Sequence, residues 1–554
     1  MPNIAFYGSH NSAYVIEDEG KILTVLEVER FLNLKNSGIA QYLCPKVTDI
    51  LFYAEYIPKF LMKKFGIEKF DNCYYLNTDV IIYTLFHLHE FIVADNYIEC
   101  KHHEAHAAGA FYQSPYEKAL IFSFDGGGND GKYNVYTCER GESPKLLEFV
   151  LNPTPELRDL REAYDLGFPY MIFGHFLADI NYEPSLGTGN LVYPGKLMGL
   201  ASYGVVNEEW LPYFIDFYEA GPKGSRIDDL EEVEGIWQYQ YLLNKLTEKI
   251  GIVFDDKERL TGQLAYDVAA TNQRAFEECF LKVAKPYMEQ YPDYPICITG
   301  GCGLNIILNT RLKTEFNREV FVGPDPNDCG VALGVMLNQM KPLHQVDSTY
   351  SGLPLLDLDM LGHYIQKEQF PFKVNYLDVE TLIDDLSNGY IVGVARGNSE
   401  HGPRALGNRS IICNPLIPDM KDVLNAKVKH REWYRPFAPV VRLEDVSEYF
   451  EWEGESRWMS FCPKVREEWQ DKLPAITHID GTARVQTVTR EQNEWLYDIL
   501  TAFKEKTGVG VLLNTSFNVD GKPILSTLQD AFTILEKTQM DCLVIEDHYI
   551  KKLR

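Results

Sequence analysis

The stretch from Lys101 to Asp130 restricts the fold most, because it joins a histidine-bearing segment to a buried strand that ends in glycines. KHHEAHA at 101–107 places His102 and His106 four residues apart, and its alanines favour a helix that presents both imidazoles on one face. The apolar run ALIFSF at 119–124 predicts a strand, at whose end Asp125 can supply an oxygen beside the histidines. We therefore expect an α/β domain with polar side chains gathered at the end of this strand.

A second carboxylate with a similar setting is Asp328, in PDPNDCGVALG, which stands before a glycine and a helix start rich in small residues. His102, His106, Asp125 and Asp328 together form a mixed nitrogen and oxygen set, which suits iron(II), manganese or zinc and differs from the all-oxygen set that magnesium prefers. The alternative for the two histidines is packing or helix capping, because HxxxH is a short pattern. The sequence therefore predicts a candidate metal site.

Two glycine loops each follow a predicted strand. DGGGND follows the strand at 119–124, and TGGCGLN at 299–305 follows a strand at 295–299. Uncovered backbone N–H groups suit a phosphate, and this arrangement predicts two walls of one nucleotide cleft. A tight strand-to-helix turn is the alternative for the second loop. The residues assigned to nucleotide binding are Gly126, Gly127, Gly128, Gly300, Gly301 and Asn305.

The length of 554 residues predicts two domains. Residues 3–8, 12–16 and 21–26 read as short strands, with a tight hairpin turn at 17–20, and 264–291 reads as a long helix. KPLHQVDSTYSGLPLL at 341–356 is rich in Pro, Ser and Gly and has little periodicity, so we place the boundary there. The expected domains are 1–345 and 353–554, and strands at 390–395, 509–513 and 541–545 make the second one α/β as well.

The second domain carries arginines among Gly, Pro and apolar residues, in EHGPRALGNRS, KHREWYRPFAPVVR and DGTARVQTV. A guanidinium has a planar fork of donors that matches phosphate and carboxylate, so these arginines predict an anion pocket. LLNTSFNVDGKPI at 512–524 can complete it with polar side chains just past a strand. A solvated basic face and ion pairs to buried carboxylates are the alternatives. The residues concerned are Arg404, Arg409, Arg435, Arg484, Asn514, Ser516 and Asn518.

Composition argues against several other classes of protein. Eleven cysteines without a CxxC pair argue against a zinc knuckle or disulfide scaffold, and reduced thiols in a cytoplasm are the simplest account. No signal peptide or membrane span is recognisable, so we expect a cytoplasmic protein. The formal charge of -27 disfavours attraction to nucleic acid or anionic membrane. KFLMKKFGIEKF at 59–70 and the terminal KKLR keep a DNA substrate open as an expectation.

Taken in order, these motifs resemble the O-carbamoyltransferases of the nodulation-protein, cephalosporin and tobramycin type over nearly the whole chain. Further markers are GSHNSAYVI, EVERFLNLK and GKLMGLASYG at 195–204. The resemblance implies an N-terminal carbamoyl-transfer domain of the actin-like ATPase fold and a C-terminal YrdC-like domain that forms carbamoyl adenylate. ATP and carbamoyl phosphate would give carbamoyl adenylate and pyrophosphate, after which an acceptor hydroxyl takes the carbamoyl group and releases AMP.

By the same resemblance, the two histidines and two aspartates above match metal ligands, with iron(II) expected first. Arg404, Arg435, Arg484, Asn514 and Ser516 match a carbamoyl-phosphate pocket. His10 and Lys35 match motif positions near the first-domain cleft. We expect His10 to take the acceptor proton and Lys35 to hold a phosphate oxygen, although either side chain can instead be structural.

Two departures from the family pattern do not touch those positions. The chain reads Val28-Glu29-Arg30 where relatives often have a glutamate pair before the arginine, and GKLMGLASYG ends in Ser-Tyr where Pro-Tyr is usual. Both can alter acceptor fit. The acceptor is expected to be a small molecule with a hydroxyl, with hydroxymethylated DNA less favoured, and a homodimer is expected. The alternatives are a phosphotransferase of the sugar kinase type and a noncatalytic nucleotide-binding protein.

Overall fold

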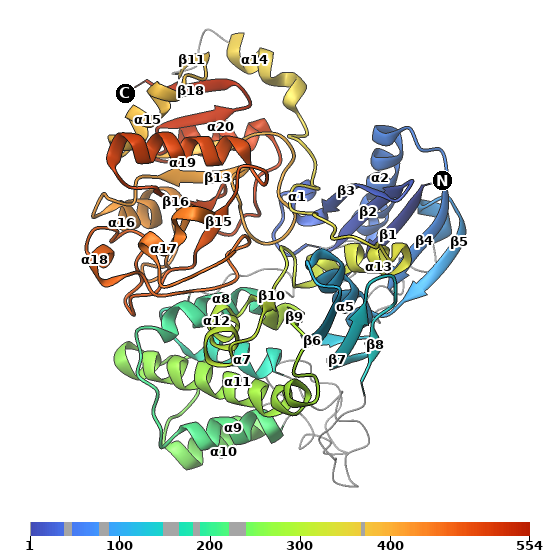
Figure 1. Ribbon diagram of the computed structural model, residues 1–554, viewed down its shortest axis with the longest axis vertical. Helices are drawn as coiled ribbons and strands as arrows, with labels where there is room; N and C mark the ends of the chain where they lie inside the picture. Colours follow the sequence, from blue (N-terminus) through green and yellow to red (C-terminus); the bar gives the residue numbers. More distant parts are fainter. Residues whose placement is uncertain are drawn as a thin grey trace. The chain divides into compact units, whose positions relative to one another are not determined.

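The computed structural model describes residues 2–37, 47–76, 88–147, 166–180, 189–220, 240–366 and 372–553 (Figure 1). The chain divides into two compact units. Unit 1 comprises Met1–Gly20 and Gly38–Val346, and unit 2 comprises Lys21–Ser37 and Asp347–Arg554. Among the described residues, no helix combines the length and apolar character needed to cross a bilayer.

In unit 1, strands β2, β1, β4 and β5 lie in this order in one sheet. β1 pairs antiparallel with β2 and parallel with β4, which in turn pairs parallel with β5. Ala5, for example, lies opposite Val15 on one side and Tyr74 on the other, and all of β1 except its first residue is buried. The strand bounds are Asn3–Tyr7, Ala13–Asp18, Phe70–Leu76 and Ala94–Cys100 for β1, β2, β4 and β5.

The second sheet of unit 1 has the order β10-β9-β6-β7-β8. Its central strand β6 pairs antiparallel with β7 and parallel with β9, and β9 pairs parallel with β10. The run β7-β6-β9-β10 therefore repeats the order and the strand directions of β2-β1-β4-β5. This duplicated topology confirms the predicted α/β class and is that expected of the actin-like ATPase fold. The strand bounds are Lys118–Gly128, Gly131–Glu139, Lys145–Leu146, Ile296–Thr299 and Val320–Phe321 for β6 to β10.

Helix α5 (His102–Gln113) packs against helix α13 (Val331–Met340), and two glycines allow the close approach. A Cβ on Gly334 would lie 2.0 Å from the carbonyl oxygen of Ala105, and one on Gly109 would lie 3.3 Å from the Cα of Gly334. α13 is buried from Val331 to Asn338, and every α5 residue except Glu104 is buried. The helix that carries the paired histidines is thus buried along nearly its whole length.

The remaining helices of unit 1 include the long predicted helix, which is α11. Their bounds are Val47–Phe65 for α2, Leu88–Phe91 for α4, Gly167–Ile172 for α7, Tyr193–Ala201 for α8, Leu211–Ala220 for α9, Gln240–Ile250 for α10, Gly262–Gln290 for α11 and Ile306–Glu315 for α12. A short 3-10 turn at Gly301–Leu304 (η6) follows strand β9, and another at Asp328–Gly330 (η7) precedes α13.

Unit 2 contains an eight-stranded mixed sheet in the order β11-β18-β17-β12-β13-β16-β14-β15. Helices α15 and α19 cover it, with Leu382, Leu386, Leu496, Leu500 and Phe503 in one hydrophobic core with the central strands. The structure confirms the predicted α/β class here as well. The strands are Phe372–Tyr376, Val392–Ala395, Arg409–Cys413, Ala438–Arg442, Gln486–Val488, Val511–Ser516, Cys542–Ile545 and His548–Lys552 for β11 to β18.

The helices of unit 2 begin with α1 (Val28–Leu32) in its N-terminal segment. The others are α14 (Leu361–Gln366), α15 (Val379–Ser387), α16 (Met420–Leu424), α17 (Val446–Tyr449), α18 (Glu467–Gln470), α19 (Glu494–Thr507) and α20 (Leu528–Lys537), together with a π-helical turn, η9 (Asn425–Lys429).

Residues 21–37, which include strand β3 (Lys21–Glu27) and α1, cluster with unit 2. The guanidinium of Arg30 donates to the carbonyl oxygens of Glu400 and Gly402 and lies 3.0 Å from the Glu27 carboxylate. Glu27 also accepts a hydrogen bond of 2.9 Å from the Gly402 N–H. The predicted tight turn that precedes β3 is confirmed, since Glu19 and Gly20 both adopt positive φ angles, 51° and 77°.

Candidate metal centre and arginine cluster

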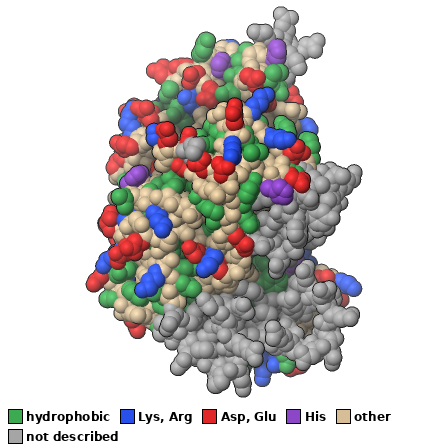
Figure 2. All heavy atoms as spheres, turned by 90° about the vertical axis from the view of Figure 1, so that its right-hand side faces the viewer, with side chains coloured by type: hydrophobic (Ala, Val, Ile, Leu, Met, Phe, Trp, Pro, Cys, Tyr) green, Lys and Arg blue, Asp and Glu red, His purple; other side chains and the backbone are tan. Residues whose placement is uncertain are grey.

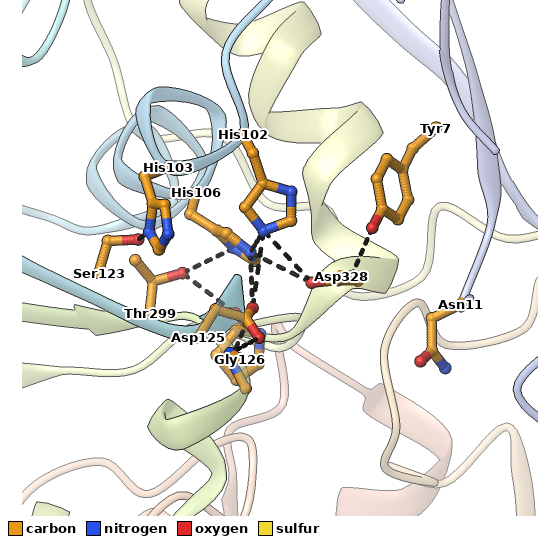
Figure 3. Close-up of polar contacts among 12 residues, drawn as sticks. Tyr7, Asn11, His102, His103, His106, Ser123, Asp125, Gly126, Thr299 and Asp328 are labelled. Atoms are coloured by element: carbon orange, nitrogen blue, oxygen red, sulfur yellow. Dashed lines mark hydrogen bonds and ion pairs between the residues drawn. The ribbon is translucent and has the colours of Figure 1, made fainter. Parts of the chain in front are cut away.

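Four side chains of unit 1, here called the metal cluster, converge on one point (Figure 3). His102 and His106 lie on α5, Asp125 lies on β6, and Asp328 begins the turn η7. Each offers one ligand atom, and these atoms all lie within 4.8 Å of one another. The four residues that the sequence suggested as a set are therefore brought together.

The distances between the ligand atoms of the metal cluster are short enough for all four to bind one ion. The Nε2 atoms of His102 and His106 are 3.1 Å apart. His106 Nε2 lies 3.2 Å from Asp125 Oδ2 and 3.4 Å from Asp328 Oδ1, and the corresponding distances from His102 Nε2 are 3.7 and 3.6 Å. Both histidines and Asp328 are buried. Two imidazole nitrogens and two carboxylate oxygens thus point into one small volume.

The chemistry of these donors fits a divalent cation. Asp328 Oδ1 is buried, and the Nε2 atoms of His106 and His102 approach it at 3.4 and 3.6 Å. Burial opposes the protonation of His106, but hydrogen bonds to Asp125 and Asp328 outweigh it and raise the pKa of His106 to about 9. Burial likewise opposes ionisation of Asp125, but bonds from His102 and His106 hold its pKa well below the usual value. Without a cation, a proton held by the histidines must balance the charge of the two carboxylates. A site at which a proton takes the place of a cation in this way is expected of metal ligands.

A third histidine on α5, His103, has a different part. Its Nδ1 lies 2.8 Å from Ser123 Oγ and its Nε2 lies 2.8 Å from the carbonyl oxygen of Gly131, so both ring nitrogens are used inside the fold. Burial, followed by the neighbouring His102, lowers the pKa of His103 to about 4. A neutral His103 therefore anchors α5 to the hairpin of β6 and β7.

The turn between β6 and β7 caps the first turn of α5, which the sequence did not reveal. The Asn129 side chain accepts a hydrogen bond of 3.0 Å from the His102 N–H. The Asp130 carboxylate accepts one of 2.8 Å from the His103 N–H and one of 3.3 Å from the Glu104 N–H. These bonds satisfy helix donors that have no partner within the helix. The only sequence signal was the Asn-Asp pair that ends DGGGND.

Thr299, at the end of β9, orients His106. Its hydroxyl donates to the carbonyl oxygen of Pro326 at 3.2 Å and lies 3.4 Å from His106 Nδ1. Because the Thr299 hydroxyl donates its proton to Pro326, its oxygen is free to accept a hydrogen bond from the Nδ1–H of His106. The Nε2 lone pair then faces the metal cluster, as a ligand histidine requires.

His10 and Tyr7 lie beside Asp328 (Figure 3 labels Tyr7). His10 Nε2 is 3.3 Å from Asp328 Oδ2, and its Nδ1 is 3.2 Å from Asn11 Oδ1. The His10 side chain keeps 28% of its surface exposed. The Tyr7 hydroxyl donates to Asp328 Oδ2 at 2.6 Å. Tyr7 was not singled out from the sequence, and the role of His10 as a base stays a prediction.

Lys35 lies in the N-terminal segment of unit 2, shortly after α1, and is partly buried. Its role in holding a phosphate also stays a prediction.

The two glycine loops meet at Asp125. Its carboxylate accepts hydrogen bonds from the N–H of Gly126 at 2.6 Å and of Gly301 at 3.1 Å. Gly126 and Gly127 are exposed, and a Cβ on either would meet nothing within 4 Å. These two positions leave open backbone, as the predicted phosphate site requires.

At Gly128 and Gly300 the packing leaves no room for a side chain, and at Asn305 the side chain is needed for hydrogen bonds within the fold. A Cβ on Gly128 would lie 2.6 Å from the His102 ring. Gly300 has a φ of 83°, and a Cβ there would lie 1.7 Å from the Phe124 carbonyl oxygen. The Asn305 side chain caps α12 through the Leu308 N–H at 3.0 Å and exchanges hydrogen bonds with Gln273. The part of all six positions in nucleotide binding remains a prediction.

In unit 2, four arginines, here called the arginine cluster, lie close enough to repel one another. Burial, and then Arg435, lowers the pKa of Arg404, while burial, Arg404 and Arg435 hold that of Arg484 well below normal. Burial, Arg435 and Arg484 do the same for Arg431. Like charges that are partly removed from water are costly unless an anion accompanies them.

The carboxylates near the arginine cluster are few. Arg435 Nη1 lies 3.4 Å from the Glu432 carboxylate and 4.0 Å from that of Asp520. Within the described ranges, neither Arg404 nor Arg484 has a hydrogen-bond or ion-pair partner, and the Nε of Arg484 is buried without one. The cluster therefore has the charge and the free donors that the predicted anion pocket requires.

A framework of neutral side chains and one lysine supports the arginine cluster. Asn425, which begins η9, accepts from Arg431 Nε at 2.7 Å and donates to the carbonyl oxygens of Trp433 and Arg435 at 3.5 and 3.3 Å. Buried Lys429, which ends η9, donates to the Ser516 carbonyl and hydroxyl oxygens at 2.7 and 3.2 Å and to the Asn518 carbonyl oxygen at 2.9 Å. Single π-helical turns are frequent at functional sites.

Asn514 and Ser516, both predicted for the pocket, lie on β16 beside this framework. The Asn514 amide donates to the Ala405 carbonyl oxygen at 3.1 Å and to Gln486 Oε1 at 2.6 Å. Gln486 uses its own amide N–H on the Leu406 carbonyl, so the orientation of the pair is fixed. Asn514 Oδ1 is left buried and accepts no hydrogen bond from the described residues. The Ser516 hydroxyl donates to Asn518 Oδ1 at 2.7 Å.

Arg409 does not share the situation of the arginine cluster. Its guanidinium is buried and donates to the carbonyl oxygens of Arg396, Asn408 and Gly397 at 2.8 Å and to that of Leu353 at 3.4 Å. The expectation that Arg409 belongs to the anion pocket is therefore wrong, since its donors tie loops together. Arg431 and Lys429 lie at the cluster instead, and neither was predicted from the sequence although both stand in KHREWYRPF.

Comparison with known families matches both parts of the chain. The family described as "Carbamoyltransferase N-terminus" matches residues 46–337, and "Carbamoyltransferase C-terminus" matches residues 383–552. The chain belongs to the carbamoyltransferase family and is a transferase.

Several relatives are similar over most of their length. Nodulation protein NolO of Bradyrhizobium diazoefficiens is 33% identical over 470 residues, covering 81% of this chain and 78% of that protein. Nodulation protein NolNO of Sinorhizobium fredii is 31% identical, covering 98% of this chain and 79% of that protein. The 3'-hydroxymethylcephem-O-carbamoyltransferase of Streptomyces clavuligerus is 31% identical over 390 residues, covering 69% of each.

Among solved structures, full-length HypF in its phosphate- and nucleotide-bound form is similar with 16% identity and a TM-score of 0.34, covering 61% of this chain and 46% of that one. The activator of the 2-hydroxyisocaproyl-CoA dehydratase from Clostridium difficile, with bound ADPNP, has 15% identity and a TM-score of 0.32, covering 61% and 94%.

Proposed function

We propose that this protein is an ATP-dependent O-carbamoyltransferase that works through carbamoyl adenylate. Carbamoyl phosphate and water give carbamate and phosphate, and a carbamate oxygen then attacks the α-phosphorus of ATP and displaces pyrophosphate. In the second step an acceptor hydroxyl oxygen attacks the carbamoyl carbon, AMP leaves, and the hydroxyl proton passes to a base. The acceptor is proposed to be a small-molecule alcohol, because the name of the cephem-modifying relative specifies a hydroxymethyl group as its target.

The arginine cluster is the observation on which this proposal rests. Four guanidinium groups with few carboxylates nearby favour the binding of an anion, and carbamoyl phosphate supplies two charges on a small phosphate. The same region holds the buried, unsatisfied Asn514 Oδ1, which can accept from the carbamoyl NH₂ group. An anion that also carries a donor amide matches both features, whereas a plain phosphate would leave the amide oxygen unsatisfied. A sugar kinase would have no use for this cluster.

The transfer step is proposed to take place at the metal cluster of the carbamoyl-transfer domain, residues 1–345, and adenylate formation in the domain formed by residues 353–554. His102, His106, Asp125 and Asp328 would hold a divalent cation, with iron(II) expected first and manganese or zinc as alternatives. When bound, the cation would supply positive charge near the AMP phosphate, where negative charge develops as AMP leaves the carbamoyl carbon. His10, 3.3 Å from Asp328, is proposed as the group that takes the acceptor proton, and Lys35 as a phosphate contact.

A small-molecule acceptor is favoured over hydroxymethylated DNA. Figure 2 shows acidic and basic side chains interspersed over the described part of one face, without a continuous basic area there. The formal charge of -27 acts in the same direction, because DNA binding depends on clustered positive charge. A homodimer is proposed as the assembly and can be checked by light scattering.

Isotope exchange tests the first step. Protein, ATP, a divalent cation and labelled pyrophosphate are incubated with and without carbamoyl phosphate. We expect label in ATP only when carbamoyl phosphate is present, since pyrophosphate can re-form ATP only from a carbamoyl adenylate. Absence of exchange in both arms, together with ATP consumption that depends on a sugar, would replace the proposal with a kinase.

A further inference from the structure

The two oxygens of the Asp328 carboxylate have different neighbours. Oδ1 lies 3.4 and 3.6 Å from the Nε2 atoms of His106 and His102. Oδ2 accepts the Tyr7 hydroxyl proton at 2.6 Å and has His10 Nε2 at 3.3 Å. Figure 3 shows Tyr7 reaching Asp328 from the side away from the two histidines. The carboxylate is therefore divided into a half that faces the metal cluster and a half that faces β1.

The Tyr7 hydroxyl is held in place by the sheet. Tyr7 is the last residue of β1, is 2% exposed and pairs with Ala13 of β2. Its carbonyl oxygen accepts the Ser12 hydroxyl, and its ring lies tilted against the His102 ring at 5.8 Å between centroids. A short hydrogen bond from a hydroxyl to an ionised carboxylate is among the stronger neutral-to-charged contacts in proteins. His10 is more exposed and more distant, so it is the weaker of the two partners of Oδ2.

We propose that Tyr7 is a positioning residue that makes Asp328 a ligand through one oxygen only. Its hydroxyl occupies Oδ2, so Oδ1 alone remains available to a cation. A carboxylate that binds through both oxygens would take an additional coordination position on the cation, and the Tyr7 bond would prevent this. This inference rests on the proposed metal site and concerns the geometry of that site, independently of turnover.

Cobalt(II) replacement tests the proposal without an activity assay. Wild-type protein and a Tyr7→Phe variant are titrated with Co²⁺ against a chromophoric chelator, and the visible spectra are recorded. We expect about 10- to 100-fold weaker Co²⁺ binding in Tyr7→Phe, the range for loss of an outer-shell partner of a ligand. We also expect weaker visible absorption per bound Co²⁺, because added oxygen coordination moves cobalt away from the strongly absorbing tetrahedral geometry.

A Tyr14→Phe variant is the matched control. Tyr14 is buried on the neighbouring strand β2 and stacks on Phe6 at 4.7 Å between centroids. The Tyr14→Phe variant loses a hydroxyl oxygen as Tyr7→Phe does, and it should bind Co²⁺ as the wild type does. Melting curves check that both variants fold. Wild-type affinity and spectrum in Tyr7→Phe would overturn the inference. Failure of the wild type to bind Co²⁺ would instead remove the metal site, while leaving the pyrophosphate exchange test of adenylate formation untouched.

Discussion

The metal cluster of unit 1 and the arginine cluster of unit 2 differ in how their charges are balanced. In the metal cluster, carboxylates face imidazoles, and the pKa of His106 is raised because Asp125 and Asp328 outweigh the effect of burial. In the arginine cluster, burial and neighbouring arginines lower the pKa of Arg404, Arg431 and Arg484. The first arrangement can be balanced by a single proton or cation, whereas the second has few carboxylates of its own, so that an external anion would stabilise it. Substitutions should therefore act in opposite ways on stability and on ligand binding.

The largest effect is expected from Arg404→Ala. A hydrogen bond to a charged group contributes about 1.5–3 kcal/mol, so the loss of this guanidinium should raise the KM for carbamoyl phosphate about 10- to 150-fold. The melting temperature should stay the same or rise, because repulsion from Arg435 is removed and no described partner is left unpaired. Pyrophosphate exchange as a function of carbamoyl phosphate concentration, with a thermal melt, measures both quantities.

Arg442→Ala is the matched control for Arg404→Ala. Arg442 has partners in the same unit, with its Nε 2.7 Å from Asp445 Oδ2 and its Nη1 3.0 Å from Thr501 Oγ1. Its removal should lower the melting temperature and leave the KM unchanged. If Arg404→Ala lost stability as Arg442→Ala does, Arg404 would have a structural role and the contrast between the two clusters would be wrong.

A smaller effect is expected from Asn425→Ala, which alters the support of the arginine cluster and leaves every charge in place. The variant removes the acceptor of Arg431 Nε and the donor to two loop carbonyls. We expect the KM for carbamoyl phosphate to rise about 10-fold, which corresponds to the loss of one hydrogen bond to a charged group at the low end of its energy range. The kcat should change little.

Asn414→Ala separates positioning from general destabilisation. Asn414 is buried in the same unit, donates to the Ser387 carbonyl at 3.2 Å and accepts from the Leu416 N–H at 2.9 Å. It should lose comparable stability without a change in KM. An equal rise in KM in both variants would show that Asn425 has no specific effect on the arginines.

The sequence predicted the parts of the molecule that local patterns decide. The spacing of His102 and His106 requires only a helix, and Asp125 requires only the end of a buried strand, so both could be predicted. Strands β1, β2, β3, β6, β9, β12, β16 and β17 and the long helix α11 were predicted for the same reason, whereas the other strands were not. Partners such as Thr299 and Tyr7 could not be, because they reach the metal cluster from strands that are remote in sequence.

The arginines illustrate the same limit within one motif. Arg404 and Arg409 stand five residues apart in EHGPRALGNRS, yet only Arg404 lacks partners in the described part of unit 2, since Arg409 begins strand β13 and donates to loop carbonyls. No pattern distinguishes them, because the difference depends on which loops fold over each guanidinium. Likewise, no signal indicated that residues 21–37 cluster with unit 2, since the carbonyl partners of Arg30 lie 370 and 372 residues away in the sequence.

The smallest effect is expected from Asp130→Ala, which removes part of the cap of α5. Losing a capping side chain costs about 0.5–2 kcal/mol in the free energy of unfolding. Thr527→Ala is the control in unit 2, because Thr527 caps α20 through the Asp530 N–H at 3.1 Å and should cost a similar amount. Denaturant unfolding measures both variants, and Co²⁺ titration should distinguish them, since only Asp130 borders the helix of the metal cluster.

The effect of Asp130→Ala on Co²⁺ affinity should stay below that of Tyr7→Phe, at less than about 10-fold, the lower end for outer-shell partners. Asn129 still accepts from the His102 N–H, and His103 still fixes the helix through Ser123 and Gly131. A loss as large as that of Tyr7→Phe would show that the cap, and not His103 with the glycine contact to α13, sets the position of the two ligand histidines. Metal binding would then depend on the stability of one helix end, and the self-supporting character assigned to the metal cluster would be lost.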